Sequence, residues 1–172
     1  MGKLYLVPTP IGNLKDITFR AIEVLAQVDL ILAEDTRITK KLLKHYKINA
    51  KTKSYHIYNE HKLLNGIIDL LISDNNIALV SDSGFPCISD PGFLLVREVI
   101  RKGIDFVSLP GASSIIPALT QSGFPTINFI FEGFLPKKKG RNKKIKELSK
   151  ETRTVILFES PHRLIKLLNE IK

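Results

Sequence analysis

The sequence predicts an α/β fold with a mainly parallel sheet in a first domain, followed by a second α/β domain that is incomplete. Short apolar runs alternate with amphipathic segments along nearly all of the 172 residues, which is the pattern of repeated βα units. Turn segments rich in Pro, Gly and Ser follow several of the apolar runs. The hydrophobic content of 44% is enough to bury one full core and part of a second.

The elements of the first domain follow from hydrophobic periodicity, because strands repeat every two residues and helices every 3.6. Taken in chain order, the periodicity predicts a strand at Lys3–Val7, a helix at Ile17–Val28, a strand at Leu30–Ala33, helices at Thr36–Tyr46 and Lys62–Ser73, a strand at Ile77–Val80, a helix at Phe93–Arg101, a strand at Phe106–Leu109 and a helix at Ser113–Ser122.

The segment Gly123–Pro125 predicts a domain junction, so we expect domains at 1–123 and 124–172. The second contains strands at Ile127–Phe131 and Thr154–Phe158 and a helix at Pro161–Ile171. Two strands with one or two helices do not make an independently stable layer. Because the chain stops in a helix without a capping residue, we expect a longer natural protein, or one that has degenerated.

The chain is strongly basic, with 26 Lys and Arg against 17 Asp and Glu and a net charge of +9. Such a balance favours phosphate-rich partners, because neutralising phosphates releases counterions. A Lys-rich surface kept for solubility is the alternative. One cysteine, Cys87, excludes an internal disulfide and a cysteine-based metal site. No segment predicts a signal peptide or a membrane span, so we expect a cytoplasmic protein.

Three turn segments are candidates for ligand binding: Pro8–Asn13, Ser81–Gly92 and Pro110–Ser114. Each follows a predicted strand, and ligands of open α/β sheets bind at the carboxyl ends of strands. We therefore expect the three to converge at one edge of the sheet. Each taken alone is also an ordinary tight turn. No G-x-G-x-x-G or G-K-[ST] motif is present, so a Rossmann or P-loop site is poorly supported.

Glu34, Asp35 and Arg37 are candidate catalytic residues, because they lie where a strand gives way to a helix. Deprotonating a hydroxyl requires a base within hydrogen-bond reach or an environment that stabilises the alkoxide. Asp35 or Thr36 capping the helix is the equally weighted alternative. His56 and its polar neighbours form a second candidate group, but their spacing does not predict a metal site.

The basic stretch that begins at Lys137 is the candidate RNA-binding segment, although charge runs are usually solvated loops. Few aromatic residues interrupt it, so we expect it to hold phosphates rather than to read bases. Its candidate contacts are Lys137, Lys138, Lys139, Arg141, Lys143 and Lys144.

An ordered set of motifs resembles the ribosomal RNA small-subunit methyltransferase I family, which has the tetrapyrrole-methylase (class III) fold. The motifs cover essentially the whole chain and are specific as a set. They are Val7–Leu14, Ala33–Arg37, Ser54–His56 with Asn59–Glu60, Ala78–Asp82, Ile88–Gly92, Pro110–Gly111 with Ser113, Phe131–Pro136 and Glu159–Arg163. The family usually has Asp-Ala-Gly-Thr-Pro-Gly where this chain has Asp82-Ser83-Gly84-Phe85-Pro86-Cys87, and its members continue beyond the last motif.

The resemblance implies S-adenosyl-L-methionine as cofactor, methyl transfer to the ribose 2′-hydroxyl of a cytidine in the decoding region of small-subunit ribosomal RNA, and a homodimer. Methylation of a small tetrapyrrole-like substrate, or an inactive RNA-binding or dimerisation module, are the alternatives. The motifs and turn segments together supply these candidate cofactor-binding residues: Pro8, Thr9, Ile11, Gly12, Ser81, Asp82, Gly84, Ile88, Gly111, Ser113, Ser114, Glu132 and Gly133.

Overall fold

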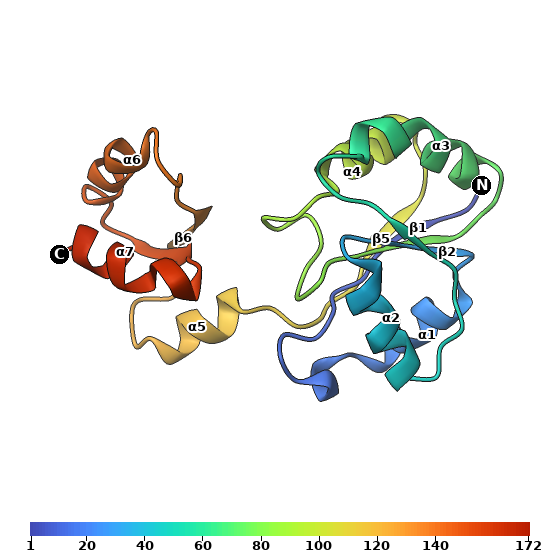
Figure 1. Cartoon of the computed structure of the whole chain (residues 1–172), viewed down its shortest axis with the longest axis horizontal. Coiled ribbons are helices and arrows are strands. Elements are labelled where there is room, and N and C mark those ends of the chain that lie inside the picture. Colours follow the sequence, from blue (N-terminus) through green and yellow to red (C-terminus); the bar gives the residue numbers. More distant parts are fainter. The chain divides into compact units, whose positions relative to one another are not determined.

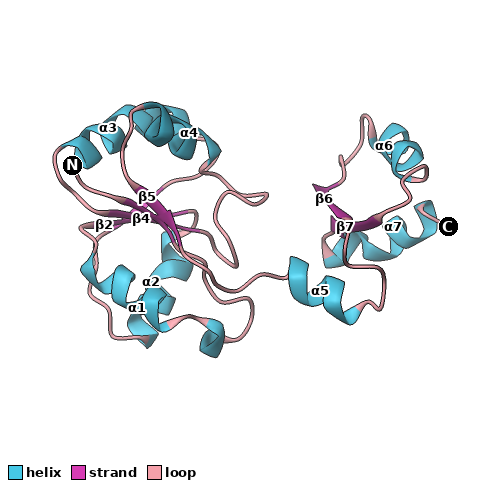
Figure 2. Cartoon of the chain, turned by 180° about the vertical axis from the view of Figure 1, so that it is seen from behind, coloured by secondary structure: helices cyan, strands magenta, loops and turns pink.

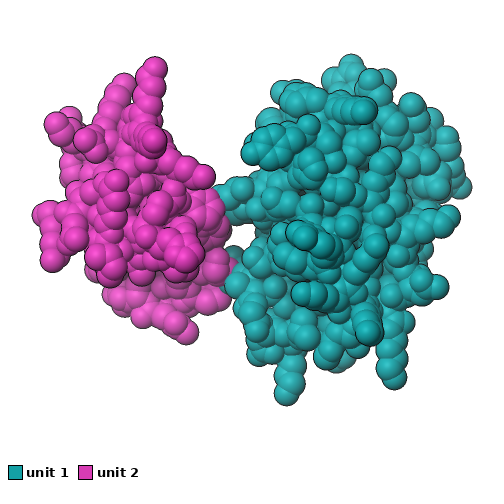
Figure 3. All heavy atoms as spheres, in the orientation of Figure 1, with its two compact units in different colours: residues 1–113 teal, residues 114–172 magenta.

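The computed structural model describes residues 1–172 and divides into two compact units, Met1–Ser113 and Ser114–Lys172 (Figure 3). The division lies before helix α5 (Ile115–Gln121), whereas the sequence predicted a junction at Gly123–Pro125. Helix α5 therefore groups with the second unit rather than with the first.

The first unit is built on a parallel sheet of five strands in the order β3-β2-β4-β1-β5. Its first strand lies inside the sheet, because Leu4 is in register with both Ile77 and Phe106. The strands are β1 (Leu4–Leu6), β2 (Leu30–Ala33), β3 (Thr52–Ser54), β4 (Ile77–Val80) and β5 (Phe106–Ser108).

Helices cover both faces of this sheet, which gives three layers (Figures 1 and 2). One face carries α1 (Phe19–Gln27) and α2 (Thr36–His45), and the other carries α3 (Glu60–Ile72) and α4 (Phe93–Arg101). Strand β4 is buried throughout because its side chains alternate between two cores: Ile77 and Leu79 pack with the α3–α4 face, and Ala78 and Val80 with the α1–α2 face.

The second unit contains a parallel pair of strands, β6 (Phe129–Phe134) and β7 (Thr154–Phe158), with a register shift between Phe131 and Gly133. Its helices are α5, α6 (Arg141–Leu148) and α7 (Leu164–Glu170), the last preceded by a short 3-10 turn at Pro161–Arg163. This architecture confirms the predicted α/β class and the parallel arrangement.

Two elements were not predicted, strand β3 and helix α6. Strand β3 is a short edge strand of the polar sequence Thr-Lys-Ser, so it carries no hydrophobic signal. Helix α6 lies in the run of basic residues and has little apolar periodicity. None of the helices has the length and apolar character needed to span a membrane.

Candidate active site

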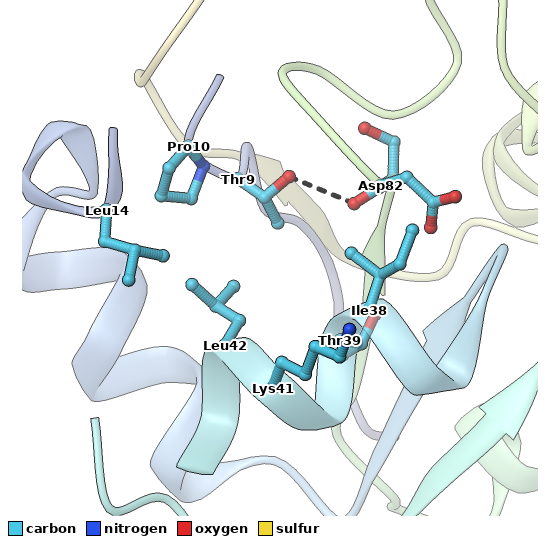
Figure 4. A pocket seen from close by; sticks show the side chains of 9 residues that line it. Thr9, Pro10, Leu14, Ile38, Thr39, Lys41, Leu42 and Asp82 are labelled. Atoms are coloured by element: carbon cyan, nitrogen blue, oxygen red, sulfur yellow. Dashed lines mark hydrogen bonds between the residues drawn. The ribbon is translucent and has the colours of Figure 1, made fainter. Parts of the chain in front are cut away.

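The three candidate turn segments meet at one edge of the first unit's sheet, as predicted. They follow β1, β4 and β5, which are parallel neighbours, so their carboxyl ends lie together. Thr9 and Gly84 exchange two backbone hydrogen bonds of 2.9 Å, which ties the first segment to the second. The hydroxyl of Thr9 also donates to the carbonyl of Ser81 at 3.0 Å (Figure 4).

Glycine is required where these segments touch. A Cβ added to Gly111 would lie 2.8 Å from Cβ of Pro8, closer than packed carbon atoms approach. Gly84 has a φ of +79°, and a Cβ there would lie 3.1 Å from Cδ1 of Ile11. The backbone N–H groups of Gly111 and Ala112 donate to no protein atom, so this edge of the sheet offers free donors between closely packed loops.

Asp35 caps helix α2, which answers one of the questions that the sequence left open. Its carboxylate accepts from the backbone N–H of Arg37 at 2.8 Å and from the guanidinium of the same residue at 2.6 Å. These contacts lower the pKa of Asp35 to about 2. A carboxylate so strongly engaged is a poor proton acceptor at neutral pH.

Glu34 is in the opposite electrostatic situation. Burial raises the pKa of its carboxyl above the usual 4.5, and the nearby carboxylates of Asp90 and Asp82 raise it further, while His56 opposes them. A base works best when its pKa lies near the operating pH. Of the two adjacent carboxylates, only Glu34 has its pKa shifted in that direction.

His56 is held beside this carboxylate cluster by Asn59. The side-chain oxygen of Asn59 accepts from the backbone N–H of His56 at 2.8 Å, and its amide nitrogen lies 3.3 Å from Nε2. Nδ1 of His56 is buried without a partner. No group of three His, Cys, Asp or Glu side chains has the arrangement of a metal site.

Cys87 packs against the core of the first unit, on the α3–α4 face. Burial raises the pKa of its thiol to about 11, so the thiolate needed for nucleophilic attack is scarce at neutral pH. Ile88, the next residue and a candidate cofactor contact, is exposed.

The remaining predicted site residues belong to the second unit, and two of them pair with each other. Lys144, a candidate RNA contact, lies with its Nζ 2.6 Å from Oε1 of Glu132, a candidate cofactor contact. Gly133 lies next to the register shift in β6 and has a φ of +70°. Ser114 is the first residue of this unit.

Arg141 does not fit the RNA-binding role that the sequence predicted. It is only 4% exposed, and its guanidinium contacts Glu170 at 2.7 Å, Glu159 at 3.2 Å and the carbonyl of Pro136 at 3.2 Å. Its charge is neutralised inside the second unit, so it is unavailable to phosphate. Lys137, Lys138 and Lys139 remain exposed and form no ion pair.

A pocket of about 200 Å³ lies beside the three segments, between the first of them and helix α2 (Figure 4). The sequence did not predict this pocket, because its walls combine the loop after β1 with one face of α2. The lining residues are Thr9, Pro10, Leu14, Ile38, Thr39, Lys41, Leu42, Ser81 and Asp82.

The chain matches a known protein family and named bacterial proteins over nearly its whole length. Residues 3–172 match the family of Tetrapyrrole (Corrin/Porphyrin) Methylases. The chain is 50% identical to Ribosomal RNA small subunit methyltransferase I of Thermotoga maritima, over 99% of the chain and 77% of that protein. It is 52% identical to the protein of the same name from Vibrio cholerae, over 98% of the chain but only 59% of that protein.

Solved structures show the same fold at low identity. Diphthine synthase matches with a TM-score of 0.72 at 17% identity, covering 98% of this chain and 72% of that one. A cobalt precorrin-4 methyltransferase matches with a TM-score of 0.68 at 20% identity, covering 98% and 73%. The chain therefore belongs to the tetrapyrrole methylase family and, within it, to the group of ribosomal RNA small subunit methyltransferase I.

Proposed function

We propose that the protein transfers a methyl group from S-adenosyl-L-methionine to the ribose 2′-hydroxyl of a cytidine in small-subunit ribosomal RNA, in the cytoplasm. The observation that carries the proposal is the meeting of three loops beside Glu34, in a chain whose relatives are named for this kind of activity. The chain spans about three fifths of the length of the Vibrio cholerae relative.

The first unit offers a fitting site for part of the cofactor. The segments that contain Pro8, Gly84 and Gly111 pack closely, and the two glycines leave room for a ligand to approach the backbone. The free N–H groups of Gly111 and Ala112 are suited to a carboxylate or a ring nitrogen. When bound, S-adenosyl-L-methionine supplies an electrophilic methyl group on a sulfonium.

Glu34 acts in this proposal as the general base that takes the proton from the 2′-hydroxyl. Its pKa is raised by burial and by the acidic groups around it, so the carboxylate is more basic than one at the surface. Asp35 and Arg37 serve the same site by fixing the start of helix α2, and they take no proton.

RNA contacts in the second unit are assigned to Lys137, Lys138 and Lys139, which are exposed and unpaired. Lys143 is also exposed, with Glu147 at 4.0 Å as a weak partner. These side chains hold phosphates without reading sequence.

A homodimer is part of the same proposal. Large apolar side chains stand exposed in the second unit, among them Ile127 at 92% and Phe124 at 65%. Exposed apolar surface of this kind is usually covered by a partner. Light scattering that reports a monomer at high protein concentration would contradict it.

The direct test combines binding with product mapping. Calorimetric titration of the protein with S-adenosyl-L-methionine should show one site, and incubation with unmethylated small ribosomal subunits should leave one ribose-methylated cytidine. Binding of the cofactor without methylation of RNA would favour a small tetrapyrrole-like substrate. No binding of S-adenosyl-L-methionine would indicate an inactive RNA-binding or dimerisation module.

A further inference from the structure

The segment from Thr36 to Asn59 is the most one-sidedly charged part of the first unit. It contains seven Lys and Arg residues and no Asp or Glu. Such a stretch attracts a polyanion because no local carboxylate neutralises it. Helix α2 forms its first ten residues.

Three lysines of α2 are free to contact a ligand. Arg37 is engaged by Asp35, but Lys40, Lys41 and Lys44 are exposed and form no ion pair. Residues three and four apart share one side of a helix. Lys44 therefore lies on the same side as Lys40 and as Lys41, and Lys41 also lines the pocket described above.

The pocket of about 200 Å³ opens beside helix α2 (Figure 4). Ile38, Lys41 and Leu42 of α2 form one wall, and the loop after β1 forms the other. The hydroxyl of Tyr46, at the end of α2, donates to the carbonyl of Leu14, so the two walls are tied together. The pocket is thus fixed on both sides.

The volume and lining of the pocket limit what it holds. Pockets that enclose a drug-sized ligand measure about 300–1,000 Å³, so about 200 Å³ suits one ring system rather than a whole nucleoside cofactor. Pro10, Leu14 and Leu42 offer apolar surface to the faces of a ring. Asp82 also lines the pocket, and one oxygen of its carboxylate accepts from the backbone N–H of Asp35 at 3.0 Å.

We propose that this pocket receives the base of an unpaired nucleotide of the RNA substrate, and that Lys40, Lys41 and Lys44 hold the phosphates on either side of it. Enzymes that modify a base bind it unpaired in a shaped pocket, and proteins that recognise single-stranded RNA hold its unstacked bases in the same manner. This inference rests on the proposed function and adds RNA contacts on the first unit.

A charge-neutralising triple variant, Lys40→Gln with Lys41→Gln and Lys44→Gln, tests the phosphate contacts. Its affinity for a fluorescein-labelled single-stranded RNA, a uridine tract with one cytidine, is measured across a salt series. Each contact to single-stranded RNA contributes about 0.7 to the slope of log affinity against log salt. We expect the slope to fall by about two, with affinity for S-adenosyl-L-methionine unchanged.

The matched control removes the same charge from the other face of the sheet, with Lys62→Gln, Arg97→Gln and Lys102→Gln. Lys62 lies in helix α3, Arg97 in helix α4, and Lys102 follows α4. The control should keep the slope close to that of the unaltered protein. Equal flattening in both triple variants would show a general charge effect and overturn the assignment of α2.

Filling the pocket tests where the base binds. Ile38 is 43% exposed, so Ile38→Trp can fold while its ring occupies the space, and Ile38→Val is the control. We expect Ile38→Trp to lose methylation of small ribosomal subunits by at least tenfold with cofactor affinity unchanged. Loss of cofactor affinity instead would assign the pocket to S-adenosyl-L-methionine and overturn the inference.

The two proposals fail in different ways. If the unaltered protein neither binds the RNA nor methylates small subunits, the proposed function fails. If it methylates them and both the α2 triple variant and Ile38→Trp do so equally well, only the assignment of the pocket and of α2 fails.

Discussion

Two adjacent carboxylates, Glu34 and Asp35, are separated by their surroundings into different roles. Asp35 faces the helix start and a guanidinium, which favour its charged form. Glu34 is half-buried among Asp90 and Asp82, which disfavour its charged form. The sequence identified both as candidates but could not divide the roles, because the carboxylates that surround Glu34 come from a loop distant in the chain.

The first prediction concerns this pair. Glu34→Gln should lower the rate of methyl transfer by about 100-fold or more, the usual contribution of a general base. In the unaltered protein the rate should rise with pH through an apparent pKa above 4.5, because a general base accepts a proton only when it is deprotonated and the pKa of Glu34 is raised. The pH–rate profile of both proteins measures this.

Stability separates the two residues further. Glu34→Gln removes a charge that Asp90 and Asp82 repel, so the melting temperature at pH 7 should stay equal or rise. Asp35→Asn should lower it. Because the pKa of Asp35 is depressed to about 2, its stabilising effect is complete above pH 4 and is lost as pH falls through 2. A stability deficit of Asp35→Asn that persisted at pH 2 would contradict this account.

The second prediction concerns the contact between two loops. Gly111→Ala would place a Cβ 2.8 Å from Cβ of Pro8, whose ring cannot turn away. We expect the loops to separate and the affinity for S-adenosyl-L-methionine to fall at least tenfold, measured by calorimetry. Gly66→Ala is the control, because its Cβ meets nothing within 4 Å in the interior of α3.

Gly66→Ala should raise the unfolding free energy by about 0.5–1 kcal/mol, because alanine is more favourable than glycine inside a helix. Cofactor affinity equal in both variants would show that the approach of Gly111 to Pro8 does not shape the site.

At the scale of elements, the second unit depends on one buried cation. Arg141 begins α6 and contacts Glu159 after β7 and Glu170 at the end of α7. Arg163 adds a second ion pair to Glu159 at 2.6 Å. Elements far apart in the sequence are thereby joined through a single guanidinium.

The third prediction follows from this network. Arg141→Ala leaves Glu159 buried beside fewer cations, which should lower the unfolding free energy by about 3 kcal/mol. Urea unfolding followed by circular dichroism measures it. Lys143→Ala, on the exposed side of the same helix, should change it by less than about 0.5 kcal/mol. Similar values for the two variants would refute the structural role of Arg141.

Elements with regular apolar spacing could be predicted from the sequence, whereas elements that depend on distant partners could not. The helix Phe93–Arg101 and the strand Thr154–Phe158 were predicted with their observed bounds, because apolar spacing alone specifies them. Helix α6 and the burial of Arg141 were not predicted. The partners of Arg141 lie 18 and 29 residues away, so the local sequence shows only one more basic residue in a run. The polar strand β3 is defined only by its pairing with β2.

At the scale of the whole molecule, the predicted meeting of three loops held because it follows from topology. Parallel strands that neighbour one another bring their following loops to one edge, and β4, β1 and β5 are such neighbours. The pocket beside α2 could not be predicted in this way, because it depends on side chains from a loop and a helix.

The position of β1 inside the sheet has a consequence for the order of assembly during synthesis. Leu4 leaves the ribosome early, yet its two neighbours, Ile77 and Phe106, are made much later. Closing such long stretches of chain costs entropy before any pairing rewards it. The nascent chain therefore carries its first strand unpaired until β4 emerges, and all three ligand loops acquire their positions only when β5 docks on β1.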